Sequence, residues 1–300
     1  MLRLECVERG DAPREQAVDI LRFAPPADPI EWAAMSLHRC FSSLGCPELS
    51  LDGMLALAAS YGISLIELRA IGGTVDLLAY FNAQYEAGAD LAAHLRASTV
   101  RVAALDSSLH LIGPTDDERS ELAALAPWAD ALDVPWLRVF DGGKPAASAA
   151  FSEANETLAW WRELRSRNGW RADIMVETHD SLFTTDALGR FLEVVPDVSI
   201  LWDAHHTWRK GGEDPAITWP AIRERVVHVH VKDSINVPSA RHPFTYVLPG
   251  SGEFPIRRVL ELIEADGFGG PVSLEWEKLW HPYLPSLDEA LATAAKRHWW

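Results

Sequence analysis

The sequence is poor in cysteine and contains no long hydrophobic run. Its 300 residues include only Cys6, Cys40 and Cys46, an odd number without CxxC spacing. Such a set favours free thiols in a reducing compartment over a disulfide framework. No apolar run approaches the roughly 18 residues of a membrane span, and the polar N-terminus lacks the apolar core of a signal peptide. We therefore expect a cytoplasmic protein that does not interact with membranes.

Positive charge is also scarce. The chain has 27 Lys and Arg residues against 43 Asp and Glu residues, which gives a formal net charge of −16. The basic residues are scattered along the chain and do not form a cluster. A polyanion such as DNA or RNA would be repelled by this charge balance. We therefore expect no nucleic-acid partner.

Two glycine-rich nucleotide-binding motifs are absent. The segments AIGGTVD (70–76) and FDGGKPA (140–146) do not read GxGxxG, and neither GxxxxGKS nor GxxxxGKT occurs. The first motif marks a dinucleotide-binding sheet, and the second, in either form, marks a P-loop. Their absence argues against an open doubly wound sheet that binds a nucleotide.

What the sequence does have is a regular alternation of short apolar runs with longer segments of helical periodicity. Strands that alternate with helices indicate parallel βα units, and eight units in about 250 residues match a (β/α)8 TIM barrel. We predict an α/β fold of this type in one domain, residues 32–300, with a short N-terminal extension, residues 1–31. An open doubly wound sheet is the alternative. The apolar runs are residues 33–40, 63–71, 99–107, 136–143, 172–180, 198–206, 226–234 and 271–279.

Polar side chains recur at every second position near the ends of several runs. In 226–234, for example, His228, His230 and Lys232 alternate with valines. Parallel strands that are covered by helices have no face in solvent, so the polar set must point into the barrel near its C-terminal end. Residues placed there by this pattern are Glu67, Arg69, Glu177, His179, Asp203, His228, His230, Lys232, Ser273, Glu275 and Glu277.

Buried carboxylates are costly unless they are paired or bind a metal. Glu177, Asp203 and Glu275 with one imidazole form a set of three carboxylates and one histidine. This set suits Mn²⁺ or Mg²⁺ and can also bind Zn²⁺ or Co²⁺. We predict a divalent metal site, with Mn²⁺ favoured. Glu67 and Arg69 are predicted to contact substrate or, alternatively, to form a buried ion pair.

Several strand-end residues have two open interpretations. Trp202, Trp208, Trp276 and Trp280 either stack on sugar rings or pack in the core. Asp106 is predicted to form a turn, as is Asp141.

Seven segments, in this order and spacing, resemble the xylose isomerase-like TIM-barrel superfamily. This group includes sugar isomerases, ketose 3-epimerases, inosose dehydratases and AP endonuclease family 2 proteins. The resemblance covers nearly the whole chain. The segments are IELR (66–69), VPWLRVFDGG (134–143), VETHD (176–180), WDAHH (202–206), VHVHVKD (227–233), LPGSGEFP (248–255) and GFGGPVSLEWE (267–277).

The resemblance implies a role for each matching residue. It implies that the metal ligands are Glu177, Asp203, His230 and Glu275, so that His230 is preferred over His228, which is left as a core residue. It further implies that Glu177 and Glu275 are also the catalytic pair. The residues that it places beside the substrate are His179, His206 and Lys232. For Lys232, a pair with a nearby carboxylate is the open alternative.

The implied activity is isomerisation or epimerisation of a keto-sugar or polyol by proton transfer through an enediolate. Ketose 3-epimerases usually have a second Glu and an Arg where this chain has Phe183 and Asn236, which disfavours a free-ketose 3-epimerase. The alternatives are an inosose-type dehydratase and a non-catalytic sugar-binding barrel. An AP endonuclease is disfavoured by the net charge of −16. We expect a small-molecule partner, and the sequence is compatible with a homo-oligomer.

Overall fold

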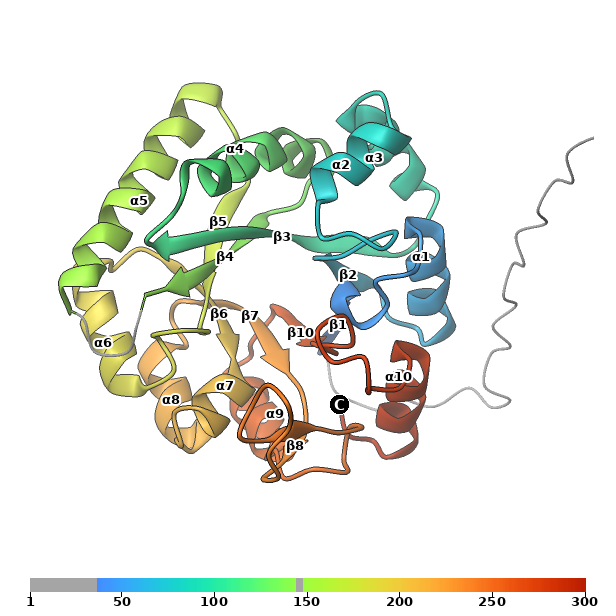
Figure 1. The fold of residues 1–300 in the computed structure, drawn as a ribbon, viewed down its shortest axis with the longest axis vertical. Coiled ribbons are helices and arrows are strands. Elements are labelled where there is room, and N and C mark those ends of the chain that lie inside the picture. Colours follow the sequence, from blue (N-terminus) through green and yellow to red (C-terminus); the bar gives the residue numbers. More distant parts are fainter. Residues whose placement is uncertain (1–36, 144–147) are drawn as a thin grey trace, which may run out of the picture.

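Eight parallel strands form a closed barrel in the computed structural model, which describes residues 37–143 and 148–300. Their order around the barrel is β1, β10, β7, β6, β5, β4, β3, β2, as Figure 1 shows. The predicted (β/α)8 barrel is confirmed, whereas the predicted extension, 1–31, lies outside the described residues. The strands are β1 (His38–Ser42), β2 (Leu65–Leu68), β3 (Arg101–Ile112), β4 (Trp136–Gly142), β5 (Asp173–Glu177), β6 (Ser199–Asp203), β7 (Val226–Val231) and β10 (Pro271–Leu274).

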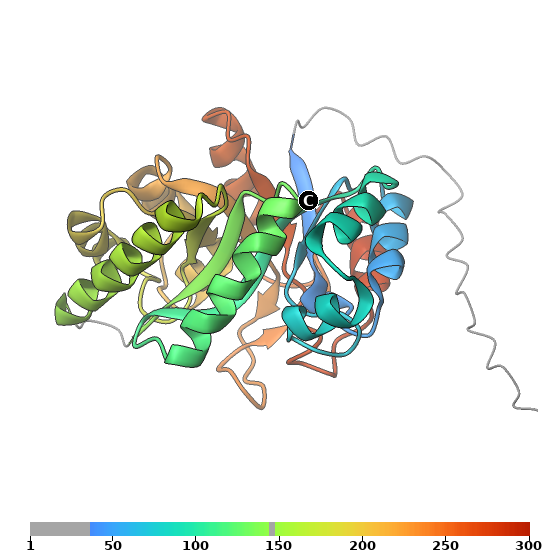
Figure 2. The same ribbon diagram turned by 90° about the horizontal axis from the view of Figure 1, so that it is seen from above.

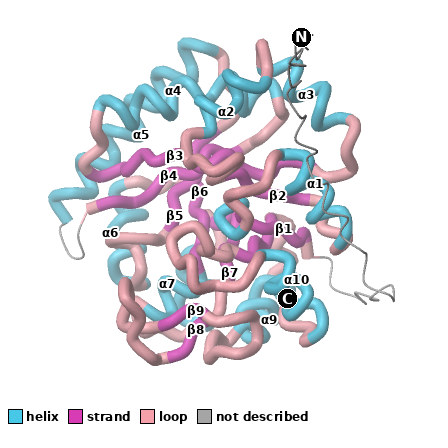
Figure 3. The backbone as a smooth tube through the Cα atoms, turned by 45° about the vertical axis from the view of Figure 1, so that its right-hand side comes forward, coloured by secondary structure: helices cyan, strands magenta, loops and turns pink. Residues whose placement is uncertain are grey.

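Helices surround the strands on the outside of the barrel (Figures 1 and 3). Several of their N-termini are capped by Ser, Thr or Asp, the residues that favour this position; Thr115 and Glu118, for example, form a capping box at the start of α4. The helices are α1 (Leu51–Ser60), α2 (Leu77–Gln84), α3 (Gly88–Arg96), α4 (Asp116–Ala131), α5 (Ser148–Asn168), α6 (Thr185–Val194), α7 (Ala204–Arg209), α8 (Pro215–Ile222), α9 (Ile256–Ala265) and α10 (Leu287–Lys296). Within the described residues, no helix combines the length and the apolar character needed to cross a membrane.

The barrel strands separate the apolar core, which lies under the helices, from the interior of the barrel. Val229 and Val231 pack in the large apolar core between strands and helices, whereas His228 and His230 point into the barrel, as the alternation predicts. A small apolar cluster inside the barrel contains Ala104, Met175 and Leu201. Each of these three residues lies two positions before an acidic residue on its own strand. The acidic side chains therefore lie nearer the C-terminal ends of the strands than this apolar cluster does.

Two short strands lie outside the barrel. β8 (Ser234–Ile235) and β9 (Thr245–Tyr246) form an antiparallel pair in the segment that follows β7. Figure 2 shows this segment and the loop after β10 projecting from the same end of the barrel. Because both follow the C-terminal ends of parallel strands, they lie on the face where barrels of this type carry their active sites.

Candidate metal centre

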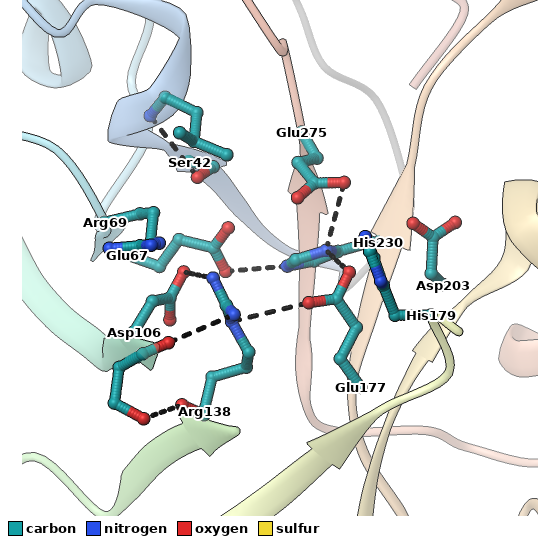
Figure 4. Close-up of polar contacts among 12 residues, drawn as sticks. Ser42, Glu67, Arg69, Asp106, Arg138, Glu177, His179, Asp203, His230 and Glu275 are labelled. Carbon is teal, nitrogen blue, oxygen red and sulfur yellow. Dashed lines mark hydrogen bonds and ion pairs between the residues drawn. The ribbon is translucent and has the colours of Figure 1, made fainter. Parts of the chain in front are cut away.

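Four buried side chains from four neighbouring strands converge inside the barrel (Figure 4). Glu177 ends β5, Asp203 ends β6, His230 is on β7 and Glu275 directly follows β10. One ligand atom from each lies within 4.8 Å of the others. Nδ1 of His230 is 3.6 Å from Glu177 Oε1 and 3.4 Å from Glu275 Oε2. The structure therefore brings together all four residues that the sequence predicts as ligands.

Most of the oxygen and nitrogen atoms that would bind a metal in this cluster have no hydrogen-bond partner in the described chain. Both carboxylate oxygens of Glu177 and Nδ1 of His230 are buried without a hydrogen-bond partner among the described residues, whereas Oδ2 of Asp203 is buried in an ion pair with Lys232. Buried polar atoms are normally satisfied, and leaving them unpaired costs about 1–3 kcal/mol each. Three carboxylates and one imidazole match the ligands of a divalent ion, so the residues present fit a metal.

The electrostatics keep the carboxylates ionised. Burial would raise the pKa of Glu177, but the guanidinium of Arg138 and the imidazole of His230 outweigh it and hold that pKa well below its usual range. For Asp203, burial is likewise outweighed by His206 and Lys232, and its pKa is also lowered. Both side chains therefore offer charged oxygens to a cation near neutral pH.

Lys232 occupies a position that the sequence left open. Its Nζ lies 2.8 Å from Asp203 Oδ2 and 2.7 Å from Glu277 Oε1, and it also contacts Glu275. The ammonium therefore pairs with two of the predicted metal ligands and with a third carboxylate. A divalent ion that bound here would compete with Lys232 for Asp203 and Glu275. Its predicted contact with substrate stays a prediction.

Glu67 lies beside His230, on its left in Figure 4 and on the side away from the other three carboxylates. Its Oε2 accepts a hydrogen bond from Nε2 of His230 at 3.0 Å and is equally close to Nε2 of His228. An N–H at Nε2 of His230 leaves the lone pair on Nδ1, which faces the carboxylates and is free to bind a metal. Glu67 is therefore placed to orient His230, and its predicted contact with substrate stays a prediction.

Arg69 is separate from this network. Its guanidinium donates to the carbonyl of Val75 and to Oγ of Ser108, both at 3.2 Å. The ion pair with Glu67, considered as an alternative from the sequence, is not formed. The proposed substrate contact of Arg69 stays a prediction.

Replacing Glu67 by Gln is expected to weaken Mn²⁺ binding by about 10- to 100-fold, as is typical when a residue that orients a metal ligand is changed. The neutral amide is a poorer acceptor for the Nε2–H of His230, so the imidazole is less firmly held in the tautomer that binds metal. Calorimetric titration with Mn²⁺ measures the effect. The exposed Glu48→Gln change is the matched control, and equal affinities for the two variants would show that Glu67 does not orient His230.

The remaining predicted substrate residues lie beside the four ligands. His206, in α7, has Nδ1 3.0 Å from Asp203 Oδ2 and 3.1 Å from the carbonyl of Thr178. Nδ1 of His179 is 2.8 Å from Asp180 Oδ1, and its ring lies edge-on to that of His206 with centroids 5.0 Å apart. His206 is buried, whereas about a third of the His179 side chain is exposed. His179 is therefore the better placed of the two to meet a ligand that enters from solvent.

Arg138 and Asp106 also lie beside the four predicted ligands. The sequence interpretation did not assign either residue to the site. Arg138, on β4, is buried with Nε 3.4 Å from Glu177 Oε2 and Nη2 3.5 Å from Asp106 Oδ2. The prediction that Asp106 forms a turn is wrong, because β3 continues to Ile112 and Asp106 is a buried strand residue inside the barrel. Burial, with Glu67 nearby, raises the pKa of Asp106 to about 7. The sequence did contain a signal for Arg138. It lies two residues after Trp136 in the run 136–143, so alternation places its side chain inside the barrel.

Asp141 fixes a turn, but in another part of the chain. Its carboxylate accepts hydrogen bonds from the backbone N–H groups of Asp180, Ser181 and Leu182, at 2.7, 2.8 and 2.6 Å. These residues follow β5, so Asp141 holds the loop that carries His179 toward the site.

The tryptophans divide between the two interpretations. Trp202 and Trp276 are buried, and the Trp202 ring packs on Trp219 with centroids 5.5 Å apart. These two pack in the core and do not stack on a ligand. Trp280, in contrast, is 37% exposed and lies in the loop after β10.

Comparison with known proteins identifies the family. Residues 55–298 match the family model described as xylose isomerase-like TIM barrel. No curated protein matches the sequence. Among solved structures, the probable 3-DHS dehydratase AsbF from Bacillus anthracis aligns with a TM-score of 0.70 and 19% identity, over 87% of this chain and 98% of that chain.

Two further structures show the same fold. The IOLI protein with a bound zinc atom aligns with a TM-score of 0.69 and 18% identity, over 87% of this chain and 96% of that one. A D-tagatose 3-epimerase-like protein aligns with a TM-score of 0.61 and 18% identity, over 87% of this chain and all of that one. At such identities the likeness shows the fold alone. The family match covers most of the chain, and the chain therefore belongs to the xylose isomerase-like TIM-barrel family.

Proposed function

We propose that this protein is a divalent-metal-dependent isomerase or epimerase that moves a proton next to the carbonyl of a keto-sugar or related polyol. The observation that supports this most is the convergence of Glu177, Asp203, His230 and Glu275 within 4.8 Å, with several donor atoms lacking hydrogen bonds. The bound zinc atom of the IOLI structure, which shares the fold, is compatible with such a centre.

These four residues would hold the ion, for which Mn²⁺ is favoured: the three carboxylates favour Mn²⁺ or Mg²⁺ over Co²⁺ or Zn²⁺, and the imidazole of His230 favours a transition metal over Mg²⁺. When bound, a divalent ion polarises a carbonyl and makes the neighbouring C–H more acidic.

The chain's own residues then carry the proton. Glu177 and Glu275 both lie close to His230 Nδ1, at 3.6 and 3.4 Å, so a substrate bound beside this cluster would have two carboxylates near it. One carboxylate accepts the proton from carbon, and the same or the other one returns it after an enediolate has formed. Lys232, His179 and His206 would donate hydrogen bonds to substrate oxygens.

A dehydratase is the second candidate, because loss of water can follow the same proton removal. Phe183 and Asn236, at the positions where ketose 3-epimerases usually have a Glu and an Arg, favour it over a free-ketose 3-epimerase. The probable dehydratase from Bacillus anthracis shares the fold. Removal of the proton next to the ketone with loss of the hydroxyl from the following carbon, as water, gives a conjugated enone that absorbs ultraviolet light, so absorbance separates the two reactions.

The experiment that tests the proposal is a screen of ketoses, inososes and keto-glycosides in D2O with added Mn²⁺. Exchange of the carbon-bound proton for deuterium is expected for at least one class of compound, since proton removal precedes all of the candidate reactions. Mass spectrometry and proton NMR detect it. Absence of exchange with every compound, in protein that binds Mn²⁺, would favour the sugar-binding alternative over the enzyme.

Mn²⁺ is also expected to stabilise the fold. An ion that binds the folded chain at 100 times its dissociation constant raises the free energy of unfolding by about 2.7 kcal/mol. Urea denaturation with Mn²⁺ and with EDTA measures the difference. A Glu177→Gln/Glu275→Gln double variant is the control and should show no difference between the two conditions. Equal stability of the wild-type protein with and without the ion would count against the site.

A further inference from the structure

A cavity of about 360 Å³ lies between the segment after β7 and the loop after β10. Its walls include Arg241 and Thr245 from the first and Trp280, His281 and Tyr283 from the second. Both segments project from the end of the barrel that carries the candidate metal centre (Figure 2). The volume is within the range of about 300–1,000 Å³ that is usual for small-molecule sites and is far too small for a protein segment of any length.

The surface around this cavity is unusually apolar. The exposed large hydrophobic residues of the described chain are only five, and three of them, Val237, Trp280 and Tyr283, belong to these two segments. Trp280 is 37% and Tyr283 53% exposed, and both line the cavity. Aromatic side chains left in solvent at the mouth of a barrel offer flat surfaces on which a ring can stack.

The cavity also carries polar groups that lack hydrogen bonds. Arg241 is exposed and has no hydrogen-bond or ion-pair partner among the described residues, although the chain has a net charge of −16. His281 is only 3% exposed, and its Nε2 has no hydrogen-bond partner in the described chain. An unpaired cation in so acidic a protein is complementary to an anionic ligand.

His281 connects the cavity to the candidate metal centre. Its Nε2 is 3.6 Å from Oε2 of Glu277, and Oε1 of Glu277 is 2.7 Å from Nζ of Lys232. Lys232 in turn lies 2.8 Å from Asp203, one of the predicted metal ligands. The cavity is therefore separated from the ligands by only two side chains, Glu277 and Lys232.

We propose that this cavity is a substrate subsite for an aromatic substituent, preferably one bearing a carboxylate, attached to the sugar or polyol that reaches the metal centre. Trp280 and Tyr283 would pack against the ring, and Arg241 would pair with the acidic group. The substrate class would then be an aryl glycoside or aryl-substituted polyol ketone, not a free monosaccharide. This inference rests on the proposed function for the position of the sugar, but the ring contact itself needs no metal.

The test compares methyl, phenyl and 4-carboxyphenyl 3-keto-glucosides, with dissociation constants measured by calorimetry on the whole protein with Mn²⁺ and with EDTA. The phenyl compound is expected to bind about tenfold more tightly than the methyl compound, a difference of the size that one aromatic contact gives. The 4-carboxyphenyl compound should bind more tightly still. This order should persist in EDTA, so a failure of the metal chemistry would leave the test of the subsite intact.

Variants of the cavity residues test whether the tighter binding of the aromatic compounds arises in this cavity. Trp280→Ala should reduce the phenyl-to-methyl ratio to about one, and Arg241→Ala should remove only the additional gain from the carboxylate. Ile217→Ala, a change of another exposed apolar residue, on α8, is the control and should leave both preferences intact. Equal affinities for the methyl and phenyl compounds, no detectable binding of either, or a preference that survives Trp280→Ala would overturn the inference. Proton exchange from the methyl compound alone would uphold the proposed function while the subsite failed.

Discussion

Replacing Glu177 by Gln is expected to lower proton exchange by at least about 10²- to 10⁴-fold, the contribution typical of a positioned acid or base. The amide cannot accept a proton from carbon, and it is a weaker ligand than the carboxylate it replaces. Both carboxylate oxygens of Glu177 are buried without hydrogen bonds, so in the described structure no other interaction depends on them except the ion pairs with Arg138 and His230. Deuterium incorporation measured by proton NMR, together with the Mn²⁺ dissociation constant, gives both effects.

The control for this change is Glu163→Gln. Glu163 lies on α5 with 72% of its side chain exposed, so the same chemical change there should leave exchange and metal binding intact. If Glu177→Gln exchanged protons at the rate of Glu163→Gln, then Glu177 would be neither a ligand nor the base.

Replacing Arg138 by Met is expected to destabilise the fold by about 3–5 kcal/mol, because removal of one member of a buried charge network leaves its partners uncompensated. The guanidinium lies between Asp106 and Glu177, and Nη1 also donates to the carbonyl of Ser107 at 3.2 Å. Its central carbon lies 4.0 Å from the ring centroid of Phe140. Because Met retains much of this packing, the loss of stability in Arg138→Met is due mainly to the removal of the positive charge. Urea denaturation with EDTA present measures it.

Two further variants isolate the electrostatic cause. Arg138→Met/Asp106→Asn removes one of the stranded carboxylates and should be more stable than Arg138→Met alone. Arg167→Met changes an exposed arginine that pairs with Glu163 and should cost no more than about 1 kcal/mol. A double variant at least as unstable as Arg138→Met would contradict the view that an unpaired Asp106 is part of the loss.

The fold and the four residues of the metal cluster could be predicted, because both follow from the alternation of side chains along the strands. Parallel strands need a helix-facing side, and valines such as Val229 and Val231 identify it, so His230 must point into the barrel. The same parity places Glu177 and Asp203 inside. Their convergence then follows from barrel closure, which brings the C-terminal ends of all strands together.

The side-chain contacts between strands could not be predicted, because they depend on strand register. The pairing of β2 with β3 shifts between Ile66 and Glu67, and that of β3 with β4 shifts between Asp106 and His110. A period of two in the sequence does not reveal such irregularities. The hydrogen bond from His230 to Glu67 joins residues 163 positions apart, and the placement of Arg138 between Asp106 and Glu177 joins three strands.

The ion-pair partners of Lys232 could not be predicted from the sequence either. The sequence placed it on the interior parity of β7 next to His230, which is what the structure shows. Whether an interior lysine meets a ligand or a carboxylate depends on which side chains reach the same point from β6 and from the segment after β10. Glu277 and Asp203 both do so.

The most direct test of a metal centre at this position is anomalous X-ray diffraction from crystals soaked in Mn²⁺, recorded at the manganese absorption edge. The expected result is one strong peak per chain at about 2.0–2.6 Å from oxygens of Glu177, Asp203 and Glu275 and from Nδ1 of His230, with Lys232 moved away from Asp203. A peak at other residues, or no peak at saturating Mn²⁺ with Lys232 still paired to Asp203, would contradict the assignment.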